Sequence, residues 1–437
     1  MNPGREWVYN PPMSDSFSFI HAADLHLGTP FSGLGETSPR MAHLLRDATL
    51  SAYENLIDLC IEEAVDFLII AGDVYDGPQR SIRVLDRFLK GASRLNQKGI
   101  RMFVATGNHD PLDARAWASL GEPPPNLLLF PAKPSSHEVT REGRILAVVH
   151  GVGYHGKTVR EDLASTISRK KPDGFEIGVL HASLGTLTGN ETYAPTTLAT
   201  LKATGLDYWA LGHVHTRTVA NQFSPVICYP GNTQALSARE TGERGAYLVR
   251  VDNPGTVKME FRALDSVRFA NCDIDLTGVT ASEAIPRMLL AAAREAGVGA
   301  KGRALLLNLA LTGKTELYED LSRPGELEEL MHQLREELAD FEPPLWVNRL
   351  LERTSAPFDL AALAKSQTIE GELVTAAASL LDDPDSLCEL CALTFARLQE
   401  KPDMRRLLGE AFAGVSPTAE LLGARDLALG LLLGEEN

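Results

Sequence analysis

Short apolar runs that stop abruptly at aspartate, asparagine or histidine constrain the fold of this chain more than any other feature. The run Phe67–Ala71 is followed by Gly72 and Asp73, and the run 102–105 leads to the sequence Thr-Gly-Asn-His-Asp at 106–110. Unbroken apolar runs of this length suit strands that are buried on both faces. Because ligands of α/β proteins bind at the carboxyl ends of such strands, the polar clusters predict a binding site there.

The same pattern recurs three more times before residue 216. Asp24 and His26 follow the run 17–20, and their spacing of two places both on one side of an extended backbone. The runs 177–180 and 208–211 both lead to histidine. The polar residues gathered at these five strand ends are Asp24, His26, Asp73, Asn108, His109, His181, His213 and His215. They offer imidazole nitrogen, carboxylate oxygen and one amide oxygen, but no thiolate.

Helical patterns lie between the first strands. Apolar residues recur at helical spacing between Leu44 and Ile61, and a second helical stretch covers about 81–96. Later apolar runs at 226–229 and 245–251 predict further strands of the same unit. The order strand, helix, strand, helix, strand predicts an α/β fold, built as an α+β sandwich.

The organisation changes near residue 265, where the aspartate and histidine clusters cease. Strand and helix patterns alternate again as far as Trp346, and beyond Phe358 leucines recur at helical spacing. We therefore expect four parts along the chain. They are a loose tail over 1–15, the motif-bearing domain over 16–264, a small α+β domain over 265–357 and a helical C-terminal segment over 358–437.

The composition of the 437 residues excludes several classes of protein. Hydrophobic residues make up 44% and charged residues 23%, which is ordinary for a globular chain with a sizeable core. A formal net charge of -16 argues against a domain that coats nucleic acid by charge alone. Five scattered cysteines do not fit a secreted disulfide framework. The first residues lack the apolar stretch of a signal peptide, and no apolar run reaches the length of about 18 residues that spans a bilayer. We expect a cytoplasmic protein without membrane contact.

The donor set at the strand ends is typical of a divalent metal site. Imidazole, carboxylate and amide donors without thiolate favour Mn²⁺, Fe or Zn²⁺ over Ca²⁺, Cu(I) or an iron–sulfur cluster. Even seven of these eight residues are too many as ligands of one small ion, but seven suit two ions that share one carboxylate. Two ions about 3.5–4 Å apart clamp the attacking and leaving oxygens of a phosphoryl group. The residues therefore point to phosphoryl chemistry.

Taken one at a time, these residues have simpler explanations. Asp24 suits a helix cap, and Asp73 or Asn108 suits a tight turn with the glycine before it. Independent turns, however, give no reason for histidines beside them. Only the combination favours a site.

The five motifs, in this order, resemble those of the calcineurin-like metallophosphoesterase family. They are Asp24-x-His26, Gly72-Asp73, Gly107-Asn108-His109-Asp110, the single His181 and Gly212-His213-x-His215. The stretch His21-x-x-Asp24-x-His26-Leu27-Gly28 resembles more narrowly the DNA-repair exonuclease branch, which includes the nuclease subunit of the bacterial SbcCD complex. The sequence Gly-Asn-Thr-Gln at 231–234 and the helical tail are more similar to the YhaO-type subgroup of that branch.

The resemblance implies a four-layer metallophosphoesterase fold, with two packed sheets flanked by helices, then a cap domain and a partner-binding helical segment. It also implies two divalent ions, with Mn²⁺ expected first and Fe or Zn²⁺ as alternatives. One ion takes Asp24, His26, Asp73 and His215, and the other takes Asp73, Asn108, His181 and His213. Asp73 then bridges the ions. His109 faces the scissile phosphate, and Asp110 orients the His109 imidazole.

On this basis we predict a metal-dependent phosphodiesterase that hydrolyses DNA as an exonuclease or endonuclease. The resemblance implies an SMC-like coiled-coil ATPase as its partner and leaves a homodimer open. Two alternatives remain. The same core can act as a phosphatase or cyclic-nucleotide phosphodiesterase on small substrates, or it can be a catalytically silent scaffold that binds DNA ends or an ATPase. Complete ligand motifs count against the scaffold, which has no use for His109.

Overall fold

The computed structural model describes most of the chain, but the tail predicted over 1–15 lies outside the described residues. These are 16–31, 37–77, 81–113, 117, 122–171, 174–185, 193–252, 255–399 and 417–434. Compact packing divides the chain into two units, of which the first combines residues 1–271, 295–308 and 338–348. Each unit combines segments that are separate in the sequence, so the division does not correspond to single boundaries. The boundaries predicted at 264/265 and 357/358 therefore stay a prediction. Among the described helices, none combines the length and apolar character needed to cross a membrane.

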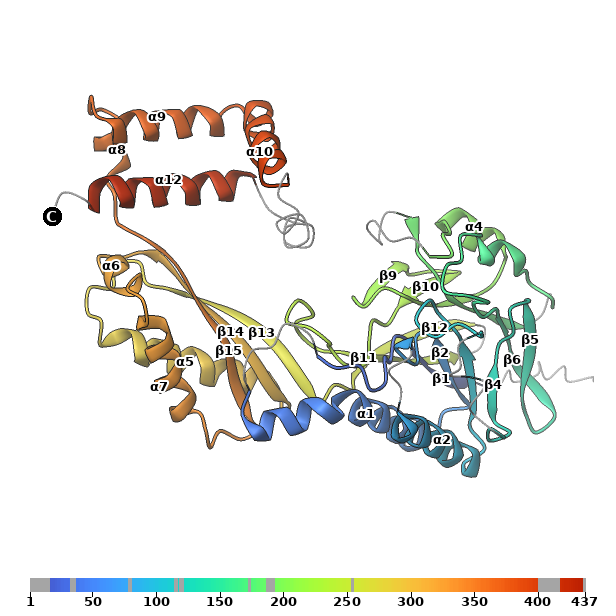
Figure 1. Cartoon of the computed structure of the whole chain (residues 1–437). Coiled ribbons are helices and arrows are strands. Elements are labelled where there is room, and N and C mark those ends of the chain that lie inside the picture. Colours follow the sequence, from blue (N-terminus) through green and yellow to red (C-terminus); the bar gives the residue numbers. More distant parts are fainter. Residues whose placement is uncertain are drawn as a thin grey trace, which may run out of the picture. The chain divides into compact units, whose positions relative to one another are not determined.

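The first sheet has six strands in the order β12-β11-β1-β2-β3-β4. The strands are β1 (Phe17–Ala22), β2 (Phe67–Ala71), β3 (Arg101–Ala105), β4 (Leu127–Leu129), β11 (Gly245–Asp252) and β12 (Thr256–Ala263). Strands β1 to β4 are parallel to one another, whereas β11 joins β1 antiparallel. The carboxyl ends of β1, β2 and β3 therefore lie along one edge of the sheet. Figure 1 labels the strands of this sheet other than β3.

The second sheet also has six strands, in the order β5-β6-β7-β8-β10-β9. The strands are β5 (Ser135–Arg141), β6 (Arg144–Gly151), β7 (Phe175–His181), β8 (Tyr208–Gly212), β9 (Thr218–Asn221) and β10 (Val226–Tyr229). Strands β6, β7, β8 and β10 are parallel. Strand β2 faces β7 and β8 across the interior, so the strand ends of the two sheets approach each other.

Large aromatic side chains fill the space between the two sheets. The Phe19 and Phe67 rings stack with centroids 4.9 Å apart, and Tyr208 of the opposite sheet meets Phe19 edge-on at 5.3 Å. Along β2, Phe67 and Ile69 face the second sheet, whereas Leu68 packs against the outer helices. All five residues of β2 are buried, which explains why its sequence shows no alternation.

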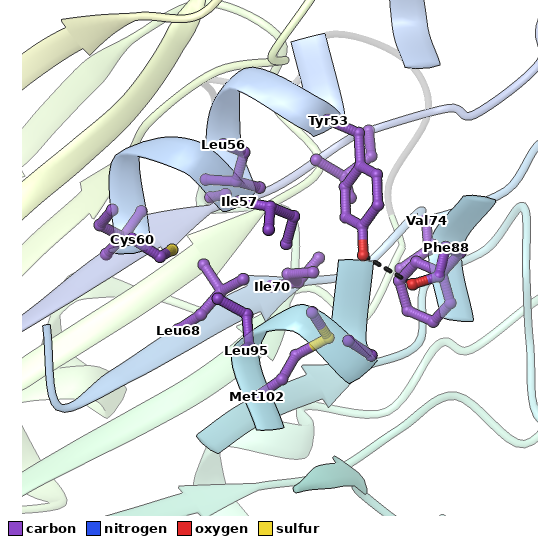
Figure 2. Packing of buried hydrophobic residues seen from close by; sticks show 14 of the residues in the cluster. Tyr53, Leu56, Ile57, Cys60, Leu68, Ile70, Val74, Phe88, Leu95 and Met102 are labelled. Carbon is purple, nitrogen blue, oxygen red and sulfur yellow. Dashed lines mark hydrogen bonds between the residues drawn. The ribbon is translucent and has the colours of Figure 1, made fainter. Parts of the chain in front are cut away.

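Helices cover the outer faces of the sandwich. Helices α1 (Pro39–Glu62) and α2 (Ile82–Gln97) are preceded by the N-cap residues Ser38 and Ser81, whose side chains accept hydrogen bonds from amides of the first turn. Both helices pack on the first sheet, and the Tyr53 hydroxyl of α1 donates to the Phe88 carbonyl of α2 at 2.8 Å (Figure 2). Helix α4 (Leu198–Ala203) and the short helix η2 (Leu163–Thr166) belong to the core on the other side. The layers confirm the predicted sandwich of two sheets flanked by helices.

Replacing Phe67 with alanine is expected to lower the free energy of unfolding by about 3–5 kcal/mol, because it empties a fully buried ring site between the sheets. Chemical denaturation measures the change. Ile82→Ala is the control, since Ile82 is 89% exposed and its loss should cost within about 0.5 kcal/mol. Equal effects of the two substitutions would contradict the packing of the sandwich.

A three-stranded sheet and a group of helices form the rest of the chain. The sheet has the order β13-β14-β15, with β13 (Val267–Asp275), β14 (Ala304–Lys314) and β15 (Leu345–Ser355). The helices that accompany these strands along the chain are α5 (Ala284–Gly299), α6 (Tyr318–Leu321) and α7 (Glu326–Glu337). The C-terminal helices are α8 (Leu360–Leu363), α9 (Ile369–Leu381), α10 (Pro384–Gln399) and α12 (Pro417–Gly434). Helix α12 packs along α9 (Figure 1).

Candidate metal centre

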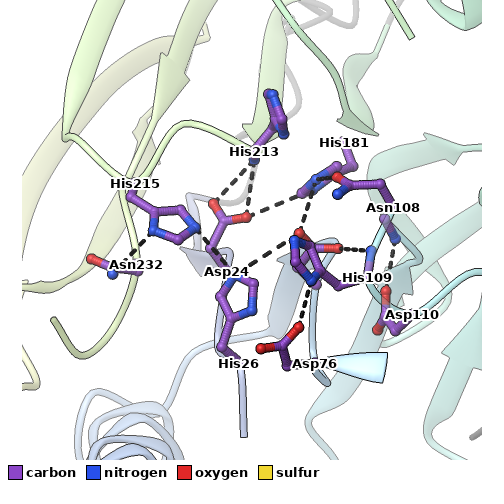
Figure 3. A network of polar contacts seen from close by, with 12 residues as sticks. Asp24, His26, Asp76, Asn108, His109, Asp110, His181, His213, His215 and Asn232 are labelled. Atoms are coloured by element: carbon purple, nitrogen blue, oxygen red, sulfur yellow. Dashed lines mark hydrogen bonds and ion pairs between the residues drawn. The ribbon is translucent and has the colours of Figure 1, made fainter. Parts of the chain in front are cut away.

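The predicted site residues lie on five loops or strand ends that meet at one place in the sandwich. Strands β1, β2 and β3 supply residues from the first sheet, and β7 and β8 supply them from the second (Figure 3). The first two loops run side by side, since the Asp24 amide donates to the Gly72 carbonyl at 3.1 Å and the His26 amide donates to the Asp73 carbonyl at 3.0 Å. The parallel pairing of β1 with β2 thus continues into the site.

Four of the predicted site residues have left-handed backbone conformations, which favour glycine. The φ angles are 52° for Asp24, 44° for His26, 51° for Asp73 and 104° for His213. Such conformations cost about 1–3 kcal/mol each and concentrate where a function requires them. The surrounding fold therefore holds these side chains in place at the expense of local backbone strain.

Two glycines leave the space that the polar side chains occupy. A Cβ atom at Gly72 would overlap the His181 imidazole, and a Cβ atom at Gly107 would overlap the Asp73 carboxylate. Gly72 also has a φ of 93°, which other residues adopt with strain. The glycines of the Gly-Asp and Gly-Asn-His-Asp motifs are thus required by close approach and not by the turn alone.

A buried group of two carboxylates and one imidazole forms the floor of the site. His181 Nε2 lies 3.2 Å from Asp73 Oδ2, and His181 Nδ1 lies 3.7 Å from Asp24 Oδ1. These three side chains are at least 97% buried. Asn108 Oδ1 lies 3.0 Å from His181 Nε2, and the His213 amide donates to both oxygens of Asp24 at 3.1 Å.

A second group adds two histidines on the opposite side of the carboxylates. His26 Nε2 lies 3.1 Å from His215 Nε2 and 3.9 Å from Asp73 Oδ2. Burial lowers the pKa of His26 to about 4, so its imidazole is neutral at physiological pH. Two imidazole nitrogens at this distance need a proton or a cation between them, because their lone pairs otherwise repel. The donor chemistry therefore fits a divalent ion.

The electrostatics of the floor also fit a cation. Burial raises the pKa of Asp24, and the neighbouring Asp73 carboxylate adds to that effect. Burial opposes the ionisation of Asp73 as well, but the charge and hydrogen bond of His181 outweigh it and lower the Asp73 pKa. Two carboxylates this close to each other inside a protein need positive charge nearby. Ligand atoms of Asp24, His26 and His215, and likewise those of Asp24, Asp73 and His181, lie within 4.8 Å of one another.

His109 lies at the rim of the site, and the structure corrects its expected partner. His109 Nδ1 donates to Asp76 Oδ1 at 2.5 Å, and the two side chains are 43% and 32% exposed. Asp110 is fully buried and instead accepts hydrogen bonds from the Gly107 and Val74 amides at 2.8 and 2.9 Å. Asp110 therefore shapes the loop, whereas the hydrogen bond to Asp76 raises the pKa of His109. The one sequence signal that could have identified Asp76 as the partner of His109 is its position three residues after the predicted ligand Asp73.

A carboxylate with no sequence signal completes the site. His215 Nδ1 donates to Glu240 Oε1 at 2.6 Å, and Glu240 Oε2 accepts from Asn232 Nδ2 at 3.1 Å. Burial opposes the ionisation of Glu240, but the hydrogen bond from His215 and its charge outweigh it and lower the Glu240 pKa to about 2. Glu240 lies in the loop between β10 and β11, where no motif marks it.

Comparisons with known proteins agree with this geometry. The calcineurin-like phosphoesterase family matches residues 17–217, and the middle domain of metallophosphoesterase YhaO matches residues 269–355. The uncharacterized metallophosphoesterase YhaO of Bacillus subtilis (strain 168) is 34% identical over 352 residues, which cover 80% of this chain and 85% of that protein.

Two further comparisons cover only part of this chain. The DNA double-strand break repair protein Mre11 of Methanopyrus kandleri is 26% identical over 266 residues, and the aligned part spans about half of its length, 55%. A solved dimetal phosphatase from Danio rerio covers 57% of this chain and 96% of its own at 12% identity, with a TM-score of 0.34. Because YhaO matches over most of both chains, this chain belongs to the calcineurin-like metallophosphoesterases, which hydrolyse phosphoester bonds with divalent metal ions, and it carries the YhaO-type middle domain.

Proposed function

We propose that the chain is a DNA nuclease that hydrolyses phosphodiester bonds with two divalent ions, Mn²⁺ first among them. One ion would be held by Asp24, His26, Asp73 and His215, and the other by Asp73, Asn108, His181 and His213. When bound, the ions supply the Lewis acidity that activates water and neutralises the phosphate. The observation that carries the proposal is the convergence of five strand ends on the buried group of Asp24, Asp73 and His181.

Two observations support DNA as the substrate. Relatives of this chain are DNA double-strand break repair proteins, although they match only about half of their own length. The pair of His109 and Asp76 is also open to solvent at the rim, which suits a phosphate within a long polymer. The net charge of -16 does not oppose this substrate, since bound cations and a partner can supply the positive charge that meets the backbone.

His109 is the residue that we assign to proton transfer. Because its Nδ1 donates to Asp76, its Nε2 is the nitrogen left for the substrate. The hydrogen bond to Asp76 raises the His109 pKa, so a larger share of the imidazole is protonated near neutral pH. A protonated imidazole at this rim can donate its proton to the leaving oxygen of the cleaved bond.

Asp76→Asn is expected to move the alkaline limb of the pH–rate profile to lower pH. The reason is that the Asp76 carboxylate raises the His109 pKa, so its loss lets His109 release its proton at lower pH. Initial rates on a single-stranded oligonucleotide between pH 6 and about 9 measure the limb. An unchanged limb, or one that moves to higher pH, would contradict the role of Asp76.

An SMC-like coiled-coil ATPase is the partner that we propose for the C-terminal helices. Exposed leucines on α10 and α12 support an interaction surface, with Leu393, Leu427 and Leu431 between 56% and 66% exposed. A coiled coil offers a matching apolar helical face. Homodimerisation stays an alternative use of this surface.

A nuclease assay tests the proposed function. Purified protein with added Mn²⁺ is incubated with single-stranded DNA, with duplex ends and with bis(p-nitrophenyl) phosphate, and His109→Ala serves as control. We expect the unmodified chain to cleave DNA and His109→Ala to cleave it far more slowly. Hydrolysis of the small ester without DNA cleavage would favour a small-substrate phosphoesterase. Inactivity on every substrate, with Mn²⁺ and again with Fe²⁺ or Zn²⁺ in its place, would favour the scaffold.

A further inference from the structure

Both carboxylate oxygens of Glu240 are used to hold the His215 side of the site. Oε1 accepts the hydrogen bond from His215 Nδ1 at 2.6 Å. Oε2 accepts from the Leu236 amide at 2.6 Å and from Asn232 Nδ2 at 3.1 Å. The Glu240 side chain is 17% exposed, so its position is fixed by these three donors and by burial. Figure 3 shows Asn232 beside the His215 ring.

Arg244 holds the other members of this cluster. Its Nη1 donates to the His215 carbonyl at 2.6 Å and to Asn232 Oδ1 at 3.2 Å, and its Nη2 donates to the Thr241 carbonyl at 3.1 Å. A guanidinium only donates, so the amide oxygen of Asn232 must face Arg244 and its NH₂ group must face Glu240. Because the Glu240 carboxylate can only accept at 2.6 Å, His215 Nδ1 is a donor, and its 3.5 Å contact with Asn232 Nδ2 is then a contact between two donors and not a hydrogen bond.

The outer nitrogens of the neighbouring histidines are held differently. His181 Nδ1 lies 3.1 Å from the Ala71 carbonyl, a neutral acceptor, and 3.7 Å from Asp24 Oδ1, which is beyond hydrogen-bond distance. His26 Nδ1 is buried without a hydrogen-bond partner among the described residues. Of these three imidazoles, that of His215 alone gives its outer N–H to a carboxylate in the described part of the chain.

We propose that Glu240 is a positioning residue that commits His215 to binding a divalent ion through Nε2 and strengthens that bond. This inference rests on the proposed two-ion site. Because Nδ1 carries the proton that Glu240 accepts, the lone pair of Nε2 is directed toward His26 Nε2, 3.1 Å away. A carboxylate behind an imidazole also raises the basicity of the ligating nitrogen, and losing such a group costs roughly 10–100-fold in metal affinity.

Metal titration tests this role. Metal-free protein is titrated with Mn²⁺, and electron paramagnetic resonance and calorimetry give the number of ions bound and the Kd of each site. Glu240→Ala is expected to weaken one of the two sites by about 10–100-fold and to leave the other unchanged. Glu240→Gln is expected to lose less metal affinity than Glu240→Ala. Its amide oxygen still accepts the hydrogen bond from Nδ1, although the negative charge is gone. Raising the Mn²⁺ concentration should restore turnover of both variants.

Glu243→Ala is the matched control. Glu243 lies in the same loop, but its carboxylate pairs with Lys301 at 3.1 Å and Arg268 at 3.5 Å, away from the histidines. It should bind both ions as the unmodified chain does. Thermal denaturation of each metal-free variant shows that the fold is kept, and Glu240→Gln carries the test if Glu240→Ala does not fold.

The outcomes separate the inference from the proposed function. If the unmodified chain binds fewer than two ions, the two-ion site fails, and this inference fails with it. If the unmodified chain binds two ions and both Glu240 variants bind them with unchanged affinity, the role of Glu240 is overturned while the proposed function stands. Equal weakening of both sites in a folded variant also overturns a role confined to His215.

Discussion

Replacing Asp73 with alanine is expected to abolish phosphodiester hydrolysis and to prevent the binding of two ions. Asp73 Oδ2 lies 3.2 Å from His181 and 3.9 Å from His26, so it is the carboxylate placed between the two groups of histidines. Metal ions contribute several kcal/mol to phosphoryl transfer, and each 1.36 kcal/mol is tenfold in rate. A loss of at least about a thousandfold in kcat follows.

Thermal denaturation with and without Mn²⁺ gives a second readout for Asp73→Ala. An ion present at 100 times its Kd stabilises the folded state by about 2.7 kcal/mol, which appears as a rise in Tm. The unmodified chain should show this rise, and Asp73→Ala should show little of it. Asp58→Ala, which removes an exposed carboxylate paired with Arg94 on α2, should behave like the unmodified chain. If Asp73→Ala showed the full Mn²⁺-induced rise in Tm, Asp73 would not be a ligand of the bound ions.

The sequence indicates the strands of the sandwich core well, because burial on both faces leaves unbroken apolar runs. The runs at 67–71 and 102–105 match β2 and β3 within a residue. The edge strands β5 and β12 leave no such run, because only one face of each packs on the core. Strand β5 has the polar sequence Ser-Ser-His-Glu-Val-Thr-Arg, and β12 alternates between exposed and half-buried residues, so neither was expected. Strand order also depends on contacts that no local pattern records.

Which loops meet could be predicted from the sequence, but the contacts within the site could not. Asp110 is adjacent to His109 in the chain, yet two backbone amides turn its carboxylate into the loop, and Asp76 reaches the ring from another strand end. Glu240 reaches His215 from a loop without any motif. Partners of this kind depend on the directions in which side chains leave their loops. Adjacency along the chain does not determine those directions.

His109→Ala is expected to lower kcat on DNA by about 10²–10⁴-fold while both ions remain bound. The imidazole is at the rim, 43% exposed, whereas the carboxylates and His181 form the buried floor. Losing a proton donor matters most when the leaving group is a poor one, as the sugar hydroxyl of DNA is. The variant should therefore keep far more of its activity on bis(p-nitrophenyl) phosphate, whose leaving group needs little protonation.

Elemental analysis of His109→Ala decides between proton transfer and a ligand role. A ligand role for His109 is compatible with the geometry, because ligand atoms of His26, Asp76 and His109 lie within 4.8 Å of one another. These three residues offer a third arrangement that could hold an ion. If His109 is a ligand, the variant loses an ion, and its activity on the two substrates falls by the same factor. Two retained ions together with a selective loss on DNA are the result that proton donation requires. The pair of measurements separates the roles because metal loss acts on every phosphoester, whereas a missing proton donor acts according to the leaving group.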